Sequence, residues 1–287
     1  MKKDEIEIRS LQRIEDLNKV RKLEGEIWGS EDSIPTHQTI TAVKNGGLVL
    51  GAYLDGQLVG FQYSFAGFNG KMPYLCSHIL GTAPKFRNKK IGEKLKWAQR
   101  AEALQLGYSL ITWTYDPLES INGYLNIAKL GSVCSTYIPN CYGEMEDLLN
   151  SGLPSDRFLV EWHIEKEKSA TLKDADFSLD TMLHNSLIQW QRNEKDLPVP
   201  SGILPLPQHD IAFVAVPKDF RNIREINMEA AMDWRMKSRE VFVNLFEQGW
   251  QVTGFHKNSI AELPVQFYIL SKKNERLLKE RCVHGEN

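Results

Sequence analysis

The stretch that decides the fold spans residues 79–92 and reads ILGTAPKFRNKKIG. Its apolar start predicts a strand that ends near Thr82, because Pro84 lacks the N–H group that a strand ladder needs. The next residues turn the chain, and Ile91-Gly92 begin an amphipathic helix. The first N–H groups of a helix have no intrahelical partner, and the helix dipole is positive there. Basic side chains surround the same point, namely Lys85, Arg87, Lys89 and Lys90. The segment therefore suits a pyrophosphate group.

This segment resembles the acyl-coenzyme A motif of the GCN5-related N-acetyltransferases (GNAT superfamily). That motif reads Arg/Gln-x-x-Gly-x-Gly/Ala after a strand and a Val-x-Pro. Thr82 stands where Val is usual, and Lys90 stands where the first Gly of the pattern is expected. A lysine there crowds the phosphate site or adds a charge to it. The matching positions are Pro84, Arg87, Ile91 and Gly92. The alternative is an ordinary strand–helix turn with a solvated basic face.

The flanking sequence predicts the element order of that acetyltransferase fold. Apolar spacing indicates helices over 16–28, 91–106 and 120–130. Asp55-Gly56 is a hairpin signal between two of the strands. Strands are expected at 6–9, 48–54, 58–65, 73–80, 109–114, 135–138 and 158–164. The resemblance therefore covers roughly residues 5–165, with the order β-α-β-β-β-α-β-α-β-β. It implies an α/β (α+β) fold, a mixed and mostly antiparallel sheet with flanking helices.

Two further motifs follow the central strand. They are Trp113-Thr114-Tyr115-Asp116-Pro117-Leu118 and, after it, Asn122 and Asn126 before Lys129-Leu130-Gly131. They resemble the marks of a subgroup of uncharacterised predicted acetyltransferases, a Trp-Thr-x-Asp-Pro-Leu run and an Asn-x-x-x-Asn before Lys-Leu-Gly. Two independent motifs at the right distance strengthen the resemblance.

Composition excludes several classes of protein. The chain has 287 residues, enough for one and a half to two domains, and a net charge of −2. There is no global electrostatic case for nucleic acid or membrane, no apolar run long enough to span a bilayer, and no secretion signal. The histidines and the four cysteines show no metal-ligand spacing. We expect a cytoplasmic protein with no bound metal and no nucleic-acid or membrane partner, acting as a monomer or homodimer.

The C-terminal part predicts a smaller second α/β region. We expect domains at 1–166 and 167–287, and an extended connection at the proline-rich segment 197–207. Val216–Asn222 echoes Ala83–Asn88, and each stretch precedes a helix, a Gly-aromatic pair and a strand. This echo is a degenerate partial repeat of the acetyltransferase core or a chance similarity. Either way, we expect this half to shape the substrate pocket or an interface and not to bind a second coenzyme A.

The resemblance also implies a cofactor site, with acetyl-CoA or another acyl-CoA as co-substrate. In that fold two parallel strands splay apart and the pantetheine lies between them. The backbone of Leu80 and Thr82 would pair with the pantetheine amides, and an N–H group near Gly81 would face the thioester oxygen. Asn122 and Asn126 would reach the cofactor from the following helix. The pyrophosphate would be held by Arg87, Asn88, Lys89, Lys90, Ile91 and Gly92.

Acyl transfer to an amine needs a neutral amine and benefits from an acid for the leaving thiolate. Family members carry a Tyr four residues before the Gly of the last motif, but that position is Ile127 here. Tyr124 is the nearest phenol, so it is either the acid or a packing aromatic. Otherwise another residue serves, or solvent protonates the thiolate.

Two more side chains are catalytic candidates. Strand alternation places His78 on the same face as Leu80 and Thr82, where it would accept the amine's proton or be a satisfied core or surface histidine. Asp116 precedes Pro117 at a strand end. It would pair with a substrate ammonium or cap the following helix start.

These residues predict an acyl-CoA-dependent N-acyltransferase. It would move an acetyl group, or a larger acyl such as succinyl, to the amine of a small molecule or amino acid by direct attack. The alternative is a non-catalytic acyl-CoA-binding protein, which the missing Tyr, Lys90 and the incomplete second half favour. A basic nucleic-acid-binding module has only the local cluster with Phe86 to support it.

Overall fold

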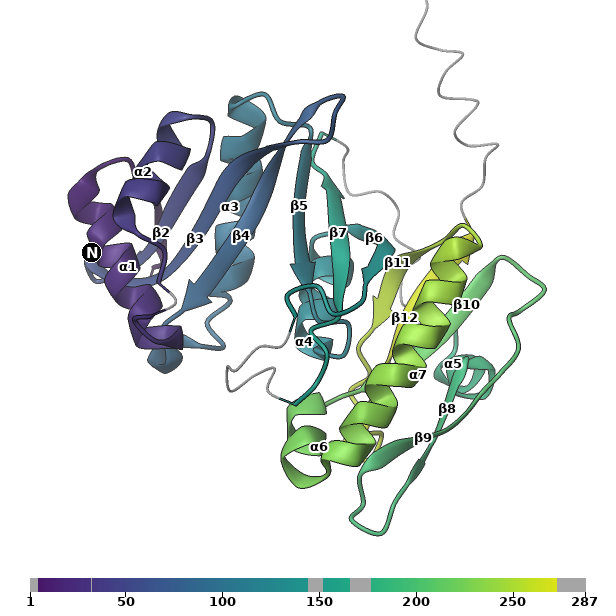
Figure 1. Ribbon diagram of the computed structural model, residues 1–287. Coiled ribbons are helices and arrows are strands. Elements are labelled where there is room, and N and C mark those ends of the chain that lie inside the picture. Colours follow the sequence, from purple (N-terminus) through teal and green to yellow (C-terminus); the bar gives the residue numbers. More distant parts are fainter. Residues whose placement is uncertain (1–4, 32, 144–151, 166–176, 273–287) are drawn as a thin grey trace, which may run out of the picture. The chain divides into compact units, whose positions relative to one another are not determined.

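The computed structural model describes residues 5–31, 33–143, 152–165 and 177–272 (Figure 1). Over these residues the chain forms two compact units. Of the described residues, unit 1 comprises 5–31, 33–113 and 161–165, and unit 2 comprises 114–143, 152–160 and 177–272.

The strands of unit 1 follow one another in the order β1-β2-β3-β4-β5. Neighbouring strands are antiparallel except β4 and β5, which are parallel. The predicted hairpin joins β2 to β3, and both turn residues have positive φ, 49° at Asp55 and 80° at Gly56, as a type I′ turn requires. The bounds are β1 Glu7–Ser10, β2 Leu48–Leu54, β3 Gln57–Phe68, β4 Pro73–Thr82 and β5 Leu110–Tyr115.

Helices cover both faces of these strands (Figure 1). Helix α1 (Ile14–Trp28) and helix α2 (Thr36–Lys44) lie on one face, and helix α3 (Ile91–Gln105) lies on the other. Apolar residues of α1 and of β2 and β3 form one buried cluster, which includes Leu17, Val20, Leu23, Val49, Phe61 and Tyr63. The sequence pattern did not indicate α2, because this short helix buries a single residue, Thr39.

Unit 2 contains strands in the order β7-β6-β11-β12-β10 and a two-stranded sheet, β8-β9. Segment 197–207 differs from its prediction as an extended connection. Pro198 and Pro200 lie in β9, where a two-stranded ladder with an irregular register tolerates missing N–H donors. The bounds are β6 Val133–Ile138, β7 Arg157–His163, β8 Ile188–Arg192, β9 Pro198–Ile203, β10 Ile211–Pro217, β11 Trp250–His256 and β12 Val265–Lys272.

The helical segments of unit 2 pack around an aromatic core. Phe158 lies 4.7 Å from Phe242 and 5.5 Å from Tyr268, measured between ring centroids. A side chain at Gly123 would approach the Tyr268 hydroxyl to 2.6 Å, so glycine permits the close packing of α4 there. The helical segments are α4 Ser120–Gly123, the π-helix η2 Tyr124–Lys129, α5 Leu179–Asn185, α6 Phe220–Ile226 and α7 Met228–Glu247.

The sheet order bears on the echo between the two halves. Strands β4 and β5, which flank α3, pair directly and in parallel. Strands β10 and β11, which flank α6 and α7, are separated by β12. The echoed segments therefore both follow a strand, but the strands that come after them are arranged differently. A partial repeat remains a prediction.

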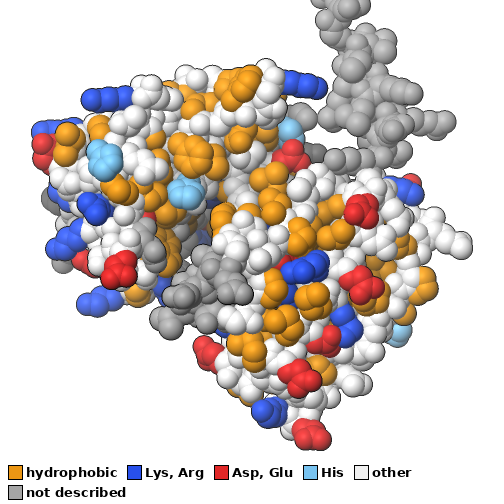
Figure 2. All heavy atoms as spheres, in the orientation of Figure 1, with side chains coloured by type: hydrophobic (Ala, Val, Ile, Leu, Met, Phe, Trp, Pro, Cys, Tyr) orange, Lys and Arg blue, Asp and Glu red, His pale blue; other side chains and the backbone are white. Residues whose placement is uncertain are grey.

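The predicted fold class is confirmed. The strands form a large, mostly antiparallel arrangement with flanking helices, and the C-terminal part is also α/β. Among the described residues no helix combines the length and the apolar character that a bilayer crossing demands. On the face shown in Figure 2, Lys and Arg side chains are interspersed with Asp and Glu.

Candidate functional site

The register between β3 and β4 contains a β-bulge at His78. Tyr63 pairs with Ile79 and Ser64 pairs with Ser77, so His78 is the extra residue on β4. A bulge bends its strand and increases the local twist, and it can re-aim a side chain or end a ladder. The bulge is therefore a point at which β4 changes direction.

The parallel ladder between β4 and β5 ends at the same point. In the described residues it joins Leu75 to Ile111 and Cys76 to Thr112. Ser77–Thr82 continues β4 beyond that ladder. The backbone groups on the β5-facing edge of Ser77–Thr82 consequently have no ladder partner in β5. They are available to an extended ligand that carries amide donors and acceptors.

The turn after β4 places two residues in left-handed backbone conformations. After the short 3₁₀ turn η1 (Pro84–Phe86), Asn88 has φ 66° and Lys90 has φ 57°. Lys90 is the N-cap residue of α3 and stands where the acyl-CoA motif has its first Gly. The backbone thus adopts a conformation that glycine takes freely, and the lysine bears a cost of roughly 1–2 kcal/mol for it.

The N-terminus of α3 is open. No side chain caps it, and its first N–H groups have no intrahelical partner. Four exposed basic side chains belong to the same turn: Lys85, Arg87, Lys89 and Lys90. Gly92 lets α3 approach β4, since a Cβ there would already lie 3.3 Å from Leu80 Cδ2. The turn therefore combines free amides, positive charge and close helix–strand packing, which suits an anion.

His78 lies on the opposite face of β4 from the one that alternation predicted. Its ring centroid is 6.1 Å from that of Tyr63 and 5.6 Å from that of Phe65. Leu80, in contrast, contacts the α3 side at Gly92. The prediction that His78 shares a face with Leu80 and Thr82 was wrong, because the bulge adds a residue and interrupts the period of two.

The face that carries His78 contains three groups with shifted pKa values. Partial burial between the two aromatic rings lowers the pKa of His78, although the residue is exposed at the surface. Burial raises the pKa of Tyr63 and of Glu24. Glu24 Oε2 accepts a hydrogen bond from the Ile34 N–H at 3.2 Å, while its buried Oε1 has no partner in the described residues. His78 is thus held as a neutral imidazole close to neutral pH.

The face that carries α3 contains a buried polar cluster around Lys96. Lys96 Nζ donates to Ser77 Oγ at 2.8 Å and lies 3.5 Å from the ring centroid of Trp113. Burial lowers the pKa of Lys96 well below its ordinary value, and the nearby Cys76 opposes this shift. Gln62, Ser64 and Gln99 complete the hydrogen-bonded cluster. Ser77 and Trp113 come directly after the last ladder pair, so Lys96 lies where β4 and β5 part.

Asp116 belongs to unit 2 and has structural partners there. Its carboxylate receives two guanidinium hydrogen bonds from Arg235 and one from the Leu118 N–H at 2.9 Å. Arg235 is 2% exposed, and the attraction of Asp116 raises its pKa although burial acts in the opposite direction. Asp116 therefore makes a local turn and an ion pair but does not cap α4, whose N-cap residue is Glu119 and whose start has no side-chain cap hydrogen bond. A catalytic role for Asp116 stays a prediction.

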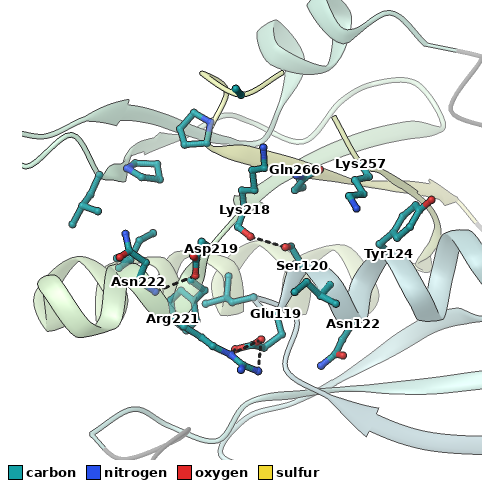
Figure 3. Close-up of a pocket in the computed structure, with 18 of the residues that line it drawn as sticks. Glu119, Ser120, Asn122, Tyr124, Lys218, Asp219, Arg221, Asn222, Lys257 and Gln266 are labelled. Atoms are coloured by element: carbon teal, nitrogen blue, oxygen red, sulfur yellow. Dashed lines mark hydrogen bonds and ion pairs between the residues drawn. The ribbon is translucent and has the colours of Figure 1, made fainter. Parts of the chain in front are cut away.

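Tyr124, Asn122 and Asn126 also belong to unit 2. Tyr124 and Asn122 line a cavity of about 1080 Å³, and Asn126 is buried (Figure 3). The Nζ atoms of Lys129 and Lys257 lie 5.6 and 4.9 Å from the Tyr124 ring centroid. The predicted site residues therefore fall into two groups, 78–92 in unit 1 and 116–126 in unit 2.

The sequence signals for Lys96 and Glu24 were weak. Lys96 and Gln99 are three residues apart on α3, and Gln62 and Ser64 are two apart on β3, so each pair shares a face. Polar residues at such spacing normally indicate solvent, which is why a buried cluster was not predicted. Glu24 occupies an apolar-spaced position of α1 between Val20 and Ile27, which could have marked it as buried.

The chain is similar to proteins of known structure. No protein-family model and no curated protein matches the chain. YncA from Salmonella typhimurium, with its cofactor acetyl-CoA, is similar at 14% identity and TM-score 0.46, over 58% of this chain and 98% of that one. The ribosomal-protein-S18-alanine N-acetyltransferase from Escherichia coli is similar at 13% identity and TM-score 0.46, over the same shares.

A third structure, the PaiA N-acetyltransferase from Thermoplasma acidophilum in complex with coenzyme A, is similar at 20% identity. Its TM-score is 0.41, and the similarity covers 56% of this chain and 99% of that chain.

Proposed function

We propose that the protein is an acyl-CoA-dependent N-acyltransferase that acts on the amine of a small molecule. The proposal depends on one observation. The bulge at His78 coincides with the end of the β4–β5 ladder, and the strand beyond it leads into the open turn before α3. An unpaired strand edge and an anion-binding turn, in that order along one strand, match the two ends of an acyl-CoA tail.

The cofactor is expected to lie along β4. Pantetheine carries two amides, which would pair with the backbone of Leu80 and Thr82 as a short extra strand does. The pyrophosphate would accept hydrogen bonds from the free amides at Ile91 and Gly92, with Arg87 nearby. The Gly81 N–H, predicted to face the thioester oxygen, is not on the β5-facing edge, because the Ala83 N–H donates to the Val59 carbonyl and alternation turns the Gly81 backbone toward β3 as well. Whether Asn122 and Asn126 contribute remains a prediction.

The reaction is direct attack. The neutral amine adds to the thioester carbonyl, a C–N bond forms, and collapse of the tetrahedral oxyanion breaks the C–S bond. His78 is the proposed acceptor of the amine's proton, because its lowered pKa keeps the imidazole neutral at pH 7. The departing thiolate takes a proton from solvent or from a general acid, for which Tyr124 remains the predicted candidate. Acetyl is the default acyl group, and succinyl is the larger alternative.

A non-catalytic acyl-CoA-binding protein is the second candidate. The observation in its favour is that Ile127, at the position of the family's Tyr, is completely buried in an apolar environment. No proton donor is available at that place. If neither solvent nor another residue protonates the departing thiolate, the protein would bind acyl-CoA without turnover.

Turnover separates the two candidates. We would incubate the protein with acetyl-CoA or succinyl-CoA and a panel of amines and amino acids, and follow the release of free thiol. The proposal predicts release that depends on the amine and that falls in the Arg87→Glu variant. Lys71→Glu is the matched control, because Lys71 is an exposed cation of unit 1 just before the other end of β4. Tight binding without thiol release for any amine would favour the non-catalytic candidate.

A further inference from the structure

Apart from Asn122 and Tyr124, the residues that line the cavity of unit 2 have no role in the proposed function. The volume of this cavity is about 1080 Å³. Four segments line it: the turn and helix after β5, the turn from β10 into α6, the loop between β11 and β12, and the end of the β8–β9 hairpin (Figure 3). All of these segments belong to unit 2. The cavity is therefore a property of that unit alone.

Most of the charged side chains around the cavity are already engaged. Arg221 forms an ion pair with Glu119 at 2.9 Å, and Arg192 forms one with Asp196 at 2.6 Å. Asp219 caps α6, since its Oδ1 accepts the Asn222 N–H at 3.1 Å. The remaining charged groups in the lining are Lys218, Lys257 and Glu262.

The two lysines carry the available positive charge. In the described part of the chain, no ion pair involves Lys218 or Lys257. Lys218 Nζ has a single long contact of 3.5 Å with the Ile260 carbonyl oxygen. Lys257 Nζ lies 4.9 Å from the Tyr124 ring centroid. Figure 3 shows both lysines beside the cavity, on the same side as Gln266.

Gln266 supplies an oriented donor. The residue is 2% exposed, and its Oε1 accepts the Asn258 N–H at 2.8 Å, which fixes the amide. Among the described residues no acceptor takes its Nε2–H₂ group. This group is not among the buried unpartnered atoms, so it is open to the cavity that Gln266 lines, where it can donate to a ligand.

Part of the remaining lining is apolar. Leu118, Phe220 and Phe255 are each at most 5% exposed and contribute their side chains to the wall. A ligand that fills the cavity therefore needs an apolar body as well as an acceptor group.

The capped helix α6 excludes a polyphosphate. Asp219 occupies the N–H group of Asn222 and places a carboxylate at the helix start. A pyrophosphate would meet that negative charge, whereas a single anionic group beside Lys218 and Lys257 would not need the helix amides.

We propose that this cavity binds a small organic anion, a carboxylate or a phosphate monoester on a compact apolar body. The anionic group lies between Lys218 and Lys257 and accepts a hydrogen bond from Gln266. The apolar body packs against Phe220 and Phe255. The inference stands on unit 2 alone and does not depend on the acyltransferase proposal.

The test uses benzoate and phenyl phosphate as probes, with phenol as the uncharged analogue, in ligand-observed NMR on the full chain. The proposal predicts that at least one anion binds and that phenol does not. The double variant Lys218→Met, Lys257→Met should weaken binding at least tenfold. Lys272→Met is the matched control at the far end of β12 and should bind as the wild type does.

Each contrary outcome overturns the proposal. The proposal is wrong if neither anion binds to the folded wild-type protein. It is also wrong if the double variant binds the anion as tightly as the wild type does. Because the α3 turn also suits anions, the Arg87→Glu variant is included, and it should retain the probe. Loss of the probe in Arg87→Glu, with retention in the double lysine variant, would assign the binding to unit 1. Thermal unfolding of each variant verifies that Lys218 and Lys257, both outside the buried core, were replaced without unfolding.

Discussion

The turn between β4 and α3 and the turn between β10 and α6 start from similar sequences and have different helix starts. Each follows a strand and contains a Pro-Lys pair and Phe-Arg-Asn. At α3 the N-cap is Lys90, no side chain caps the helix, and the amides remain free. At α6 the inserted Asp219 caps the helix with its carboxylate. The two turns therefore differ in where the helix begins and in its cap, because Phe86-Arg87-Asn88 precedes α3 whereas Phe220-Arg221-Asn222 is the first turn of α6.

The surroundings of the two turns differ in the same sense. Beside the first, a buried lysine lies in a neutral polar cluster where two strands part. Beside the second, the buried guanidinium of Arg235 lies over the Phe220 ring and is matched by an ion pair with Asp116. We infer that the first turn belongs to a reactive site and that the second belongs to a stable binding wall.

Replacing His78 with Gln should lower kcat by about 10²–10⁴-fold, the usual contribution of a general base. In the wild type, activity should fall as the pH drops through the pKa of His78, which lies below its ordinary value of 6.5, because the protonated ring cannot accept a proton. This decrease in activity at low pH should be absent in His78→Gln. A pH–rate profile that is the same in both proteins would remove His78 from the mechanism.

Removing the carboxylate of Asp116 should destabilise unit 2. Asp116→Ala leaves the buried guanidinium of Arg235 without its partner, an effect of about 3–5 kcal/mol on the free energy of unfolding. Chemical denaturation followed by tryptophan fluorescence measures it. The affinity for acyl-CoA, measured at denaturant concentrations below the unfolding transition, should be unchanged. If Asp116→Ala were as stable as the wild type but had lost turnover, Asp116 would instead have a catalytic role.

An acidic cap placed at the start of α3 should make the first turn oppose a pyrophosphate as the second turn does. Lys90→Asp keeps a residue that tolerates the left-handed conformation and adds a carboxylate at the start of α3. Acetyl-CoA affinity should fall on the order of tenfold or more, since a lost charge-assisted hydrogen bond costs about 1.5–3 kcal/mol. Calorimetric titration gives the affinity. Equal affinity in Lys90→Asp and the wild type would show that the cap does not distinguish the turns.

Lys90→Gly is the matched variant for the same position. Glycine adopts φ 57° without strain, so the free energy of unfolding should rise by about 1 kcal/mol or less. Acetyl-CoA should still bind, because the helix amides remain free. Thermal unfolding and titration report the two quantities. Destabilisation by glycine would mean that the Lys90 side chain makes contacts that outweigh the backbone strain.

The smallest expected effect concerns the buried lysine. The folded state holds the pKa of Lys96 well below 10.5, so the unfolded chain binds more protons between the two pKa values. The stability that depends on Lys96 should therefore rise with pH across that window. Lys96→Met should remove this rise and be neutral or stabilising at pH 7. Denaturation curves at several pH values check it, and an unchanged pH slope in Lys96→Met would refute the assignment.

The contrast between the two turns also shows what the sequence could predict. The strand, the turn and the start of α3 were predictable because Pro84, the basic run and Ile91-Gly92 are local signals. The bulge at His78 was not, since it depends on the register with β3, and no local pattern marks the extra residue. The face assigned to His78 failed for that reason.

The burial of the polar cluster around Lys96 was also not predictable from the sequence. Lys96 reads as a surface residue, and its position becomes intelligible when Ser77, Gln99 and the Trp113 ring surround it. Pro198 and Pro200 read as a connection, yet β8 provides a ladder that accommodates them. In each case pairing or packing with another segment of the chain decided the outcome, whereas residue patterns within one segment do not report that pairing.

Acetyl-CoA should bind at the turn before α3, and calorimetric titration of the wild type, Arg87→Glu, Gly92→Asp and Lys71→Glu measures this binding. We expect tight binding to the wild type and to Lys71→Glu, and strong loss in the two turn variants. At Gly92 the added side chain would crowd Leu80 and its charge would oppose the phosphate. No binding of acetyl-CoA or succinyl-CoA to the folded wild-type protein, or binding that both turn variants retain, would contradict this expectation.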